Sequence, residues 1–166
     1  TLYIARWCLQ YGLQILNEIN KTDAAAYQAI LVRLGIKVDE INHWQEVSKN
    51  IYLPQDIDTK LLLQQEDYLD KEQLTTADLD PAVRPINQHW SWDRILRSPF
   101  IKQADVLQGL YFFEDHFTMD QIKINFDYYE PRTVHESSLS PCVHAILACR
   151  LGYEEKAKEM YLRTAR

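Results

Sequence analysis

Apolar side chains recur every three or four residues through most of this 166-residue chain, and this spacing constrains its fold more than any other feature. The first such stretch is the clearest. On a helix, one face of it would carry Ile4, Cys8, Tyr11, Ile15 and Ile19. Glycine occurs only four times in the chain, which disfavours a turn-rich β architecture. The pattern predicts an all-α fold.

Helix-start and helix-stop residues divide the first third of the chain into successive helices. Thr22 or Asp23 is a suitable N-cap for a second helix, and Asp39 is a suitable N-cap for a third. Pro54 ends the third pattern, since proline cannot donate a backbone hydrogen bond within a helix. Short connections between such helices favour antiparallel hairpins.

The last third of the chain carries stronger helix signals. A helix from about residue 102 ends near His116, after which Thr118 and Gln121 match a capping box. Ser140, as N-cap before a proline, and Gly152, as the residue after the C-cap, bracket another helix. A final helix follows Gly152. Antiparallel helical hairpins are therefore predicted here as well.

The stretch from about residue 55 to residue 85 is polar and acidic, and it shows no helical periodicity. Residues 61–63 are three consecutive leucines and form a possible short strand. The stretch is longer than most connections, so it is predicted to be a long irregular loop, either functional or running over a surface.

The net charge of −6 disfavours non-specific nucleic-acid binding, and no apolar run is long enough to span a membrane. The cysteines Cys8, Cys142 and Cys149 lack metal spacing, which predicts small buried side chains in a reduced, cytoplasmic protein. His135 and His144 are poorly spaced for zinc. No P-loop, serine-hydrolase elbow or metal motif occurs, and no cofactor is predicted.

The heptapeptide HESSLSP at residues 135–141 combines an imidazole, a carboxylate and three hydroxyls just before a predicted helix. Hydroxyls and free backbone N–H groups at a helix start suit an anion. Ser140 as N-cap explains one hydroxyl without any ligand, whereas Ser137 and Ser138 are not needed for that cap. On the residues alone, a ligand role and simple capping remain equally open.

Two further stretches have residues that suit sugar or phosphate. Lys102 offers a positive charge and Gln103 offers both an amide donor and an acceptor, although a solvated helix start is the more usual explanation of such residues. Trp90 and Trp92 stand beside polar groups, as aromatic residues often do in sugar sites. Paired tryptophans in a helical protein are, however, more often core anchors.

Four segments together resemble glycoside hydrolase family 65 and, within it, the maltose phosphorylases. They are TLYIARWCLQY (residues 1–11), SWDRILRSPFIKQADVLQGLYFFEDHF (91–117), NFDYYEPRTVHESSLSP (125–141) and EMYLRTAR (159–166). The resemblance implies that residues 1–166 form part of an (α/α)6 catalytic barrel, with flanking β domains outside this chain.

The resemblance also implies a reaction, the phosphorolysis of maltose with inversion to β-glucose 1-phosphate and glucose. The implied partners are a glucose-containing disaccharide and inorganic phosphate as substrates, with no nucleic acid and no membrane, and the full-length enzyme is expected to be a homodimer. The residues implied to bind the sugar substrate are Lys102, Gln103 and Glu136. The residues implied to bind phosphate are Ser137, Ser138 and His135.

The catalytic acid is expected outside the chain. Phosphate is already an anionic nucleophile, so its site needs hydrogen-bond donors rather than a second carboxylate. One carboxylic acid is still required to protonate the leaving oxygen, and the resemblance places that glutamate just upstream of Thr1. The chain starts without methionine and ends within a helical pattern, so we expect a segment of a longer protein. Because that segment lacks the acid, we expect it to be inactive by itself.

Two alternatives remain open at this point. A trehalose, kojibiose or nigerose phosphorylase of the same family would carry similar motifs. A non-enzymatic α-helical repeat module is the second alternative, because LGY at residues 151–153 with Ala157 and Tyr161 resembles half of a tetratricopeptide-type pair. That architecture needs several copies at a regular period, and no second copy is found.

Overall fold

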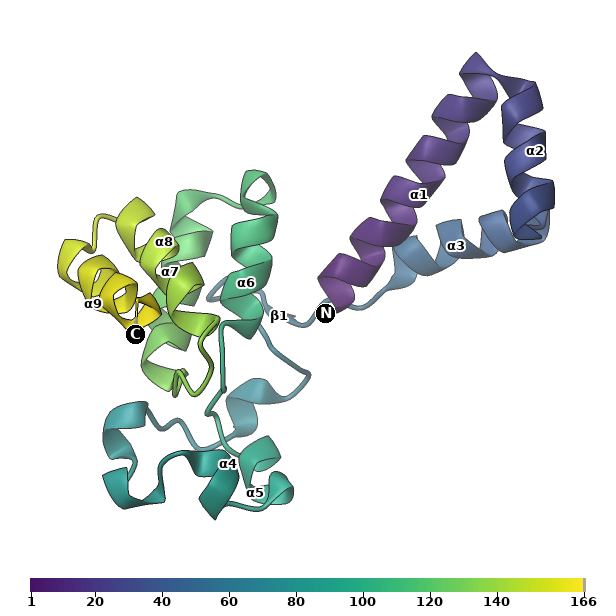
Figure 1. The fold of residues 1–166 in the computed structure, drawn as a ribbon. Coiled ribbons are helices and arrows are strands. Elements are labelled where there is room, and N and C mark those ends of the chain that lie inside the picture. The colour runs from purple at the N-terminus through teal and green to yellow at the C-terminus, as the bar shows by residue number, and fades with distance from the viewer. Residues whose placement is uncertain (166) are drawn as a thin grey trace. The chain divides into compact units, whose positions relative to one another are not determined.

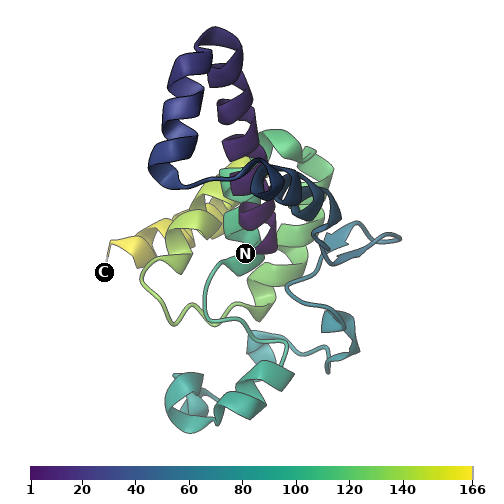
Figure 2. The same cartoon turned by 90° about the vertical axis from the view of Figure 1, so that its right-hand side faces the viewer.

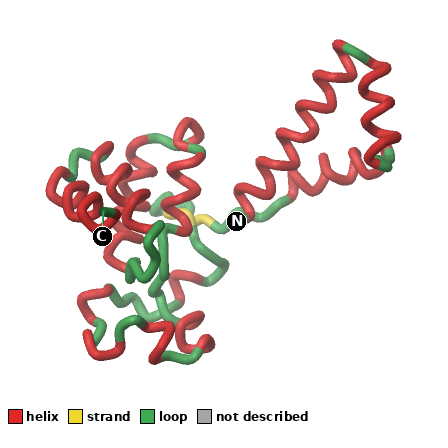
Figure 3. The backbone as a smooth tube through the Cα atoms, in the orientation of Figure 1, coloured by secondary structure: helices red, strands yellow, loops and turns green. Residues whose placement is uncertain are grey.

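The computed structural model describes residues 1–165, and the chain divides into two compact units, residues 1–53 and residues 54 onward. Nine α-helices and a single two-stranded sheet occur among the described residues. Figure 3 shows how fully helices dominate the backbone. The predicted all-α class is therefore confirmed.

The first unit consists of three helices, α1 (Leu2–Thr22), α2 (Ala24–Leu34) and α3 (Val38–Asn50). Both α2 and α3 pack against α1. Figures 1 and 2 show α2 turning back beside α1, while α3 returns toward the start of α1. Although α1 is apolar on several sides, it has no buried residue, and Leu31 of α2 is the buried hydrophobic side chain of this unit.

The caps of this unit match the predicted helix boundaries with one exception. The Asp23 carboxylate accepts a backbone N–H of α2 at 2.9 Å, and Gly35 ends that helix at a φ of 66°. Asp39 as the N-cap of α3 is wrong, because Lys37 holds that position. Asp39 instead lies in the first turn, where a carboxylate still favours the positive end of the helix dipole.

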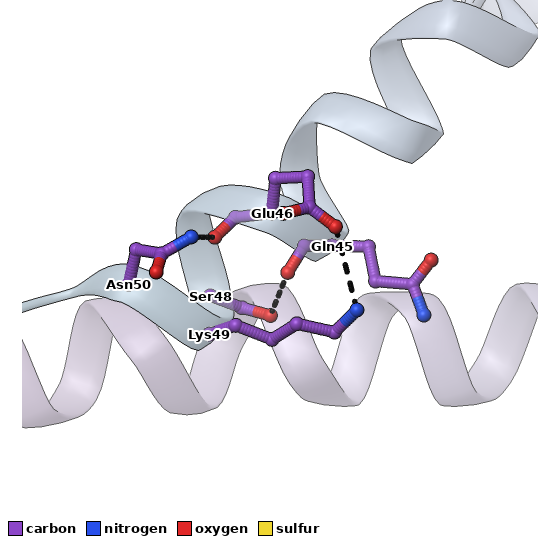
Figure 4. Close-up of polar contacts among 5 residues, drawn as sticks. All are labelled: Gln45, Glu46, Ser48, Lys49 and Asn50. Atoms are coloured by element: carbon purple, nitrogen blue, oxygen red, sulfur yellow. Dashed lines mark hydrogen bonds and ion pairs between the residues drawn. The ribbon is translucent and has the colours of Figure 1, made fainter.

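The last turn of α3 is held by local polar contacts, shown in Figure 4. Ser48 donates to the Gln45 carbonyl at 2.9 Å, and the Asn50 amide donates to the Glu46 carbonyl at 2.8 Å. Lys49 Nζ lies 3.4 Å from the Glu46 carboxylate in an exposed pair. Ser48 and Asn50 thus add side-chain hydrogen bonds to carbonyls that already lie within the reach of the helix's own N–H groups.

The main core of the second unit lies between its four longer helices. These are α6 (Asp105–Phe112), α7 (Met119–Tyr129), α8 (Ser140–Arg150) and α9 (Glu154–Thr164). Its apolar centre includes Leu107, Leu110, Ile122, Phe126 and Leu147. The pairs α6–α7 and α8–α9 pack together as the later hairpins (Figure 1).

Helix ends in this unit follow the predictions in part. Thr118 and Gln121 form the predicted capping box, with hydrogen bonds of 3.1 and 3.2 Å. Gly152 has a φ of 75°, as a residue after a C-cap requires. Ser140 as N-cap is wrong: α8 begins at Ser140 itself, and the N-cap is Leu139. The helix expected to reach His116 ends earlier, and a 3-10 helix, η4 (Glu114–His116), follows it.

The stretch predicted as a long loop is built of short ordered elements. They are β1 (Gln55–Asp56), β2 (Leu61–Leu62), and the 3-10 helices η1 (Tyr68–Asp70), η2 (Thr76–Asp78) and η3 (Pro81–Val83). Two short helices, α4 (Ile86–His89) and α5 (Trp92–Arg97), follow, so helical structure resumes before residue 102. The two strands pair antiparallel, and residues 61–62 of the leucine run form β2.

Polar side chains attach this stretch to the helical core. The Leu62 N–H donates to Asn125 at 2.8 Å, and the Tyr129 hydroxyl donates to the Leu62 carbonyl at 2.7 Å. Tyr68 is fully buried, and its hydroxyl donates to the Pro99 carbonyl. The long connection therefore has a defined course over α7 rather than a free one.

The surface of the chain bears on two predictions, the absence of a membrane-spanning segment and the burial of the cysteines. Among the described residues, no helix combines the length and the apolar character needed to cross a membrane. Burial of the cysteines is wrong, since Cys8, Cys142 and Cys149 are all exposed in this chain. Cysteine type alone predicts burial, but these three lie on the outer faces of α1 and α8.

Candidate functional site

The two stretches that sequence analysis singled out lie side by side in the second unit. Ile101 and Thr133 form a parallel bridge, in which the Ile101 N–H donates to the Arg132 carbonyl at 3.1 Å. The Val134 N–H donates back to the Ile101 carbonyl at 2.9 Å. One step further, the Glu136 N–H donates to the Lys102 carbonyl at 3.2 Å. The structure thus brings segments 101–103 and 133–138 together through their backbones.

The residues expected to meet ligands differ in their exposure. Lys102, Gln103 and Ser138 are exposed, and Ser137 is half-buried. The Ser137 hydroxyl accepts the Leu139 N–H at 3.3 Å, which shapes the turn before α8. An ammonium group, an amide and two hydroxyls are therefore carried on adjoining backbone segments.

Glu136 is held by two polar groups from the end of the long connection. Its carboxylate accepts the Ile86 N–H with both oxygens, at 2.9 and 3.0 Å. Arg84 Nε lies 3.7 Å from the same carboxylate, and the Arg84 guanidinium also donates to the Val134 carbonyl. The Glu136 side chain is only 9% exposed. Its carboxylate therefore joins residues 84–86 to the 133–138 segment.

His135 turns its ring into the protein. Its φ of 53° is in the left-handed region, which residues other than glycine and asparagine seldom adopt. Its Nδ1 lies 3.0 Å from the Ser140 hydroxyl, and its ring centroid lies 4.4 Å from that of His144, edge to face. His135 Nε2 is buried and has no hydrogen-bond partner among the described residues.

His144 lies against His135, although the sequence analysis considered the two only as a poorly spaced zinc pair. It is fully buried and lies four residues after Ser140 on α8, so both side chains share one face of the helix. Burial, with Arg163 and Lys156 nearby, lowers the pKa of His135 to about 4. Burial, with His135 beside it, lowers the pKa of His144 to about 3. Both imidazoles are therefore neutral at pH 7.

Glu130, His135 and His144 are the groups that most resemble a metal site, with possible ligand atoms within 4.8 Å of one another. The Lys156 ammonium, however, lies 3.0 Å from the Glu130 carboxylate and already neutralises it. A divalent ion would have to displace this ammonium or lie beside it, which electrostatic repulsion opposes. The arrangement favours a buried imidazole pair over a metal centre.

The tryptophan stretch divides between core and surface. Trp90 packs against Phe100 with ring centroids 5.9 Å apart, and the Arg94 guanidinium stacks 3.8 Å from the Trp90 ring. Trp92 is 72% exposed, so the core-anchor interpretation holds for Trp90 alone. Asp93 pairs with Arg97 at 3.0 Å rather than with its neighbour in sequence.

Comparison with known proteins identifies the chain's relatives. Residues 1–166 match the family model described as the glycosyl hydrolase family 65 central catalytic domain. Over all of this chain, the sequence is 49% identical to a maltose phosphorylase from Bacillus subtilis (strain 168). It is 37% identical, again over the whole chain, to an alpha,alpha-trehalose phosphorylase from Thermoanaerobacter brockii.

A solved structure shares the same fold. It is a putative kojibiose phosphorylase from the human microbiome, which superposes with a TM-score of 0.86 at 33% identity over 96% of this chain. The chain spans 21% of that structure's chain and 21% of each of the two curated relatives above. The helical hairpins described here are thus the fold of one part of much longer proteins.

Proposed function

The chain belongs to glycosyl hydrolase family 65, and from this premise we propose that it is a segment of an enzyme that cleaves maltose with inorganic phosphate. The products are β-glucose 1-phosphate and glucose, formed with inversion. Its similarity to a maltose phosphorylase, at 49% identity, supports maltose over the other disaccharides of the family. Trehalose, kojibiose and nigerose are the alternative substrates, because phosphorylases named for each of them are also similar to this chain.

One observation carries the proposal: the hydrogen bond from the Glu136 N–H to the Lys102 carbonyl. It places a cationic and amide-bearing segment directly beside a hydroxyl-bearing one. A sugar needs amide and charged groups that donate to and accept from its hydroxyls, and phosphate needs donors without a competing carboxylate. The adjoining segments offer both kinds of group.

We assign the residues to the two substrates on this basis. The sugar is bound by Lys102 and Gln103, with Glu136 at the same edge. Phosphate is held by Ser137 and Ser138, with His135 behind them. The Glu136 carboxylate, already bonded to Ile86, supports the sugar-binding edge by fixing the backbone beside Lys102.

The proposed reaction needs one proton donor from outside the chain. As phosphate attacks the anomeric carbon, the bond to the leaving glucosyl oxygen breaks, and a carboxylic acid protonates that oxygen. We place this acid upstream of Thr1, so residues 1–166 alone should be inactive. The full-length protein is proposed to work without a cofactor, as a cytoplasmic homodimer.

The test uses the full-length protein with maltose in the presence and absence of phosphate. The expected result is phosphate-dependent release of β-glucose 1-phosphate, with an equal amount of glucose. Trehalose, kojibiose and nigerose are assayed in parallel and should give far lower rates. Glucose release that is independent of phosphate would exclude a phosphorylase, and faster turnover of another disaccharide would exclude maltose as the preferred substrate.

A further inference from the structure

We infer that His135 is a positioning residue, which holds the Ser137–Ser140 turn in place through its hydrogen bond to Ser140 and rests against His144. This inference rests on the proposed function, because that turn carries the residues proposed to hold phosphate. It changes the role of His135 from a phosphate ligand to a support of the ligands.

The backbone on both sides of His135 is fixed, and this sustains its left-handed conformation. Val134 before it donates to the Ile101 carbonyl at 2.9 Å, and Glu136 after it donates to the Lys102 carbonyl at 3.2 Å. The N–H groups of both neighbours point to the backbone of residues 101–102. The φ of 53° at His135 therefore turns its side chain away from residues 101–102 and toward α8. A conformation this rare persists only where surrounding contacts determine it.

Neither ring nitrogen of His135 faces solvent, although only Nδ1 has a hydrogen-bond partner among the described residues. Its Nδ1 bonds Ser140, a residue only 1% exposed. Its Nε2 is buried, and its edge-to-face contact is with the fully buried His144. A ligand arriving from solvent at the exposed Ser138 therefore does not meet a free nitrogen of this imidazole.

The charge state agrees with a supporting role. The charged groups around the pair are Arg84, Glu130, and Lys156, Glu159 and Arg163 of α9. Burial and the surrounding cations keep the pKa of His135 near 4, so its ring brings no positive charge to an anion at neutral pH. With its proton on Nδ1, neutral His135 donates to Ser140 and leaves the serine O–H free to donate elsewhere.

The His135–Ser140 bond also closes the turn at its base. Residues 136–139 lie between the two bonded side chains, and the Ser137–Leu139 bond of 3.3 Å lies inside this closed loop. Ser137 and Ser138 then have few conformations available before phosphate arrives. Ordering a site in advance strengthens binding, because the ligand does not have to restrict the loop itself.

The experiment compares four variants of the full-length enzyme: His135→Ala, Ser140→Ala, the double variant, and His135→Asn. We expect each alanine variant to raise the KM for phosphate about tenfold while the KM for the disaccharide changes less than about twofold. The double variant should be no worse than the more severe single variant, because the same hydrogen bond is lost in every case. His135→Asn should stay within about threefold of wild type, since asparagine tolerates a positive φ and keeps a polar group near the Nδ1 position.

Hydrogen–deuterium exchange supplies a readout that does not depend on catalysis. Peptides covering residues 135–140 should exchange faster in both alanine variants than in wild type or His135→Asn. Ser91→Ala is the matched control, since Ser91 accepts a backbone N–H at 3.3 Å at the start of α5, outside the site. This control should change neither the phosphate KM nor exchange at 135–140.

The outcomes distinguish failure of the positioning role of His135 from failure of the proposed phosphorylase function. Unchanged exchange in both alanine variants, or additive effects in the double variant, would overturn the positioning role and favour direct contact between His135 and phosphate. A wild-type enzyme whose activity is independent of phosphate would instead overturn the proposed function. In that case the exchange comparison would still decide whether the hydrogen bond orders the turn.

Discussion

Both oxygens of the Glu136 carboxylate accept the backbone N–H of Ile86, although fifty residues separate the two. The bond joins the end of the 55–85 stretch to the turn that precedes α8. Because Ile86 is buried, removal of the carboxylate would leave its N–H without this partner. This single contact therefore bears on the stability of two segments at once.

Replacement of Glu136 tests that contact. Glu136→Ala should lower the free energy of unfolding by about 1–3 kcal/mol, the usual cost of leaving a buried donor without its partner. Glu136→Gln should lose less, since one amide oxygen can still accept the N–H. Urea denaturation of the full-length protein measures both. A neutral effect of Glu136→Ala, equal to that of the exposed control Glu46→Ala, would show that the contact contributes nothing.

Tyr129→Phe should loosen the start of the 55–85 stretch. The Tyr129 hydroxyl donates to the Leu62 carbonyl at 2.7 Å and accepts the Gln64 N–H at 3.1 Å. Loss of both bonds in a buried place should lower stability by about 1–3 kcal/mol and speed proteolysis near residues 60–65. Tyr161→Phe is the control, because Tyr161 is 67% exposed. Equal proteolysis in the two variants would contradict the anchoring role.

Lys102 is expected to act on ligands rather than on folding, since its side chain is exposed. Lys102→Ala should reduce kcat/KM at least about tenfold, which corresponds to one charge-assisted hydrogen bond, without a change in the melting temperature. Lys102→Arg should restore activity poorly, because guanidinium and ammonium groups differ in shape and reach. The exposed Lys158→Ala serves as control. Wild-type kinetics of Lys102→Ala would remove Lys102 from the site.

Acid should destabilise the fold through the buried imidazoles. Their pKa values in the folded chain, about 4 for His135 and about 3 for His144, lie below the ordinary histidine value of 6.5. Between the pKa of the folded chain and 6.5, the unfolded chain binds more protons than the folded chain. The free energy of unfolding therefore falls as the pH drops below 6.5. The expected slope for the fully buried His144 is up to about 1.4 kcal/mol per pH unit. Urea titrations of wild type and His144→Gln between pH 4.5 and 7 measure it, and equal slopes would contradict this account.

Chelation should leave the enzyme active. Lys156 already neutralises Glu130 at 3.0 Å, so the Glu130–His135–His144 group is not expected to hold a metal. Dialysis against EDTA, followed by assay and by elemental analysis, checks this. Stoichiometric zinc in the purified protein, or activity that zinc restores after chelation, would show that the site binds metal despite the ammonium group.

Local signals predicted the helices well, because capping and apolar spacing act within a few residues. The Thr118–Gln121 box and the turn at Gly152 are examples. Ser140 shows where local reasoning stops. Its hydroxyl resembles that of an N-cap, but the bond to His135 draws it into the interior and moves the cap to Leu139. The partner lies five residues away across a turn, beyond the two or three residues that a capping pattern covers.

The order of the 55–85 stretch and the role of His144 could not be predicted for a related reason. Asn125 and Tyr129 hold backbone groups more than sixty residues away, and nothing in the acidic stretch itself indicates this. His144 becomes relevant only through the left-handed turn at His135, which sequence spacing does not reveal. The i, i+4 relation between Ser140 and His144 was the one available signal.

The bridge between Ile101 and Thr133 is made entirely by main-chain groups. Atoms of this kind are common to all residues except for the missing N–H of proline, so the alignment of the two segments does not depend on hydrogen bonds from any particular side chain at 101 or 133. Relatives that have diverged in their side chains can thus keep the same separation between the groups at 102–103 and those at 137–138. Differences in which sugar is accepted then have to arise in side chains and in other loops, while the spacing between these two backbone segments stays the same.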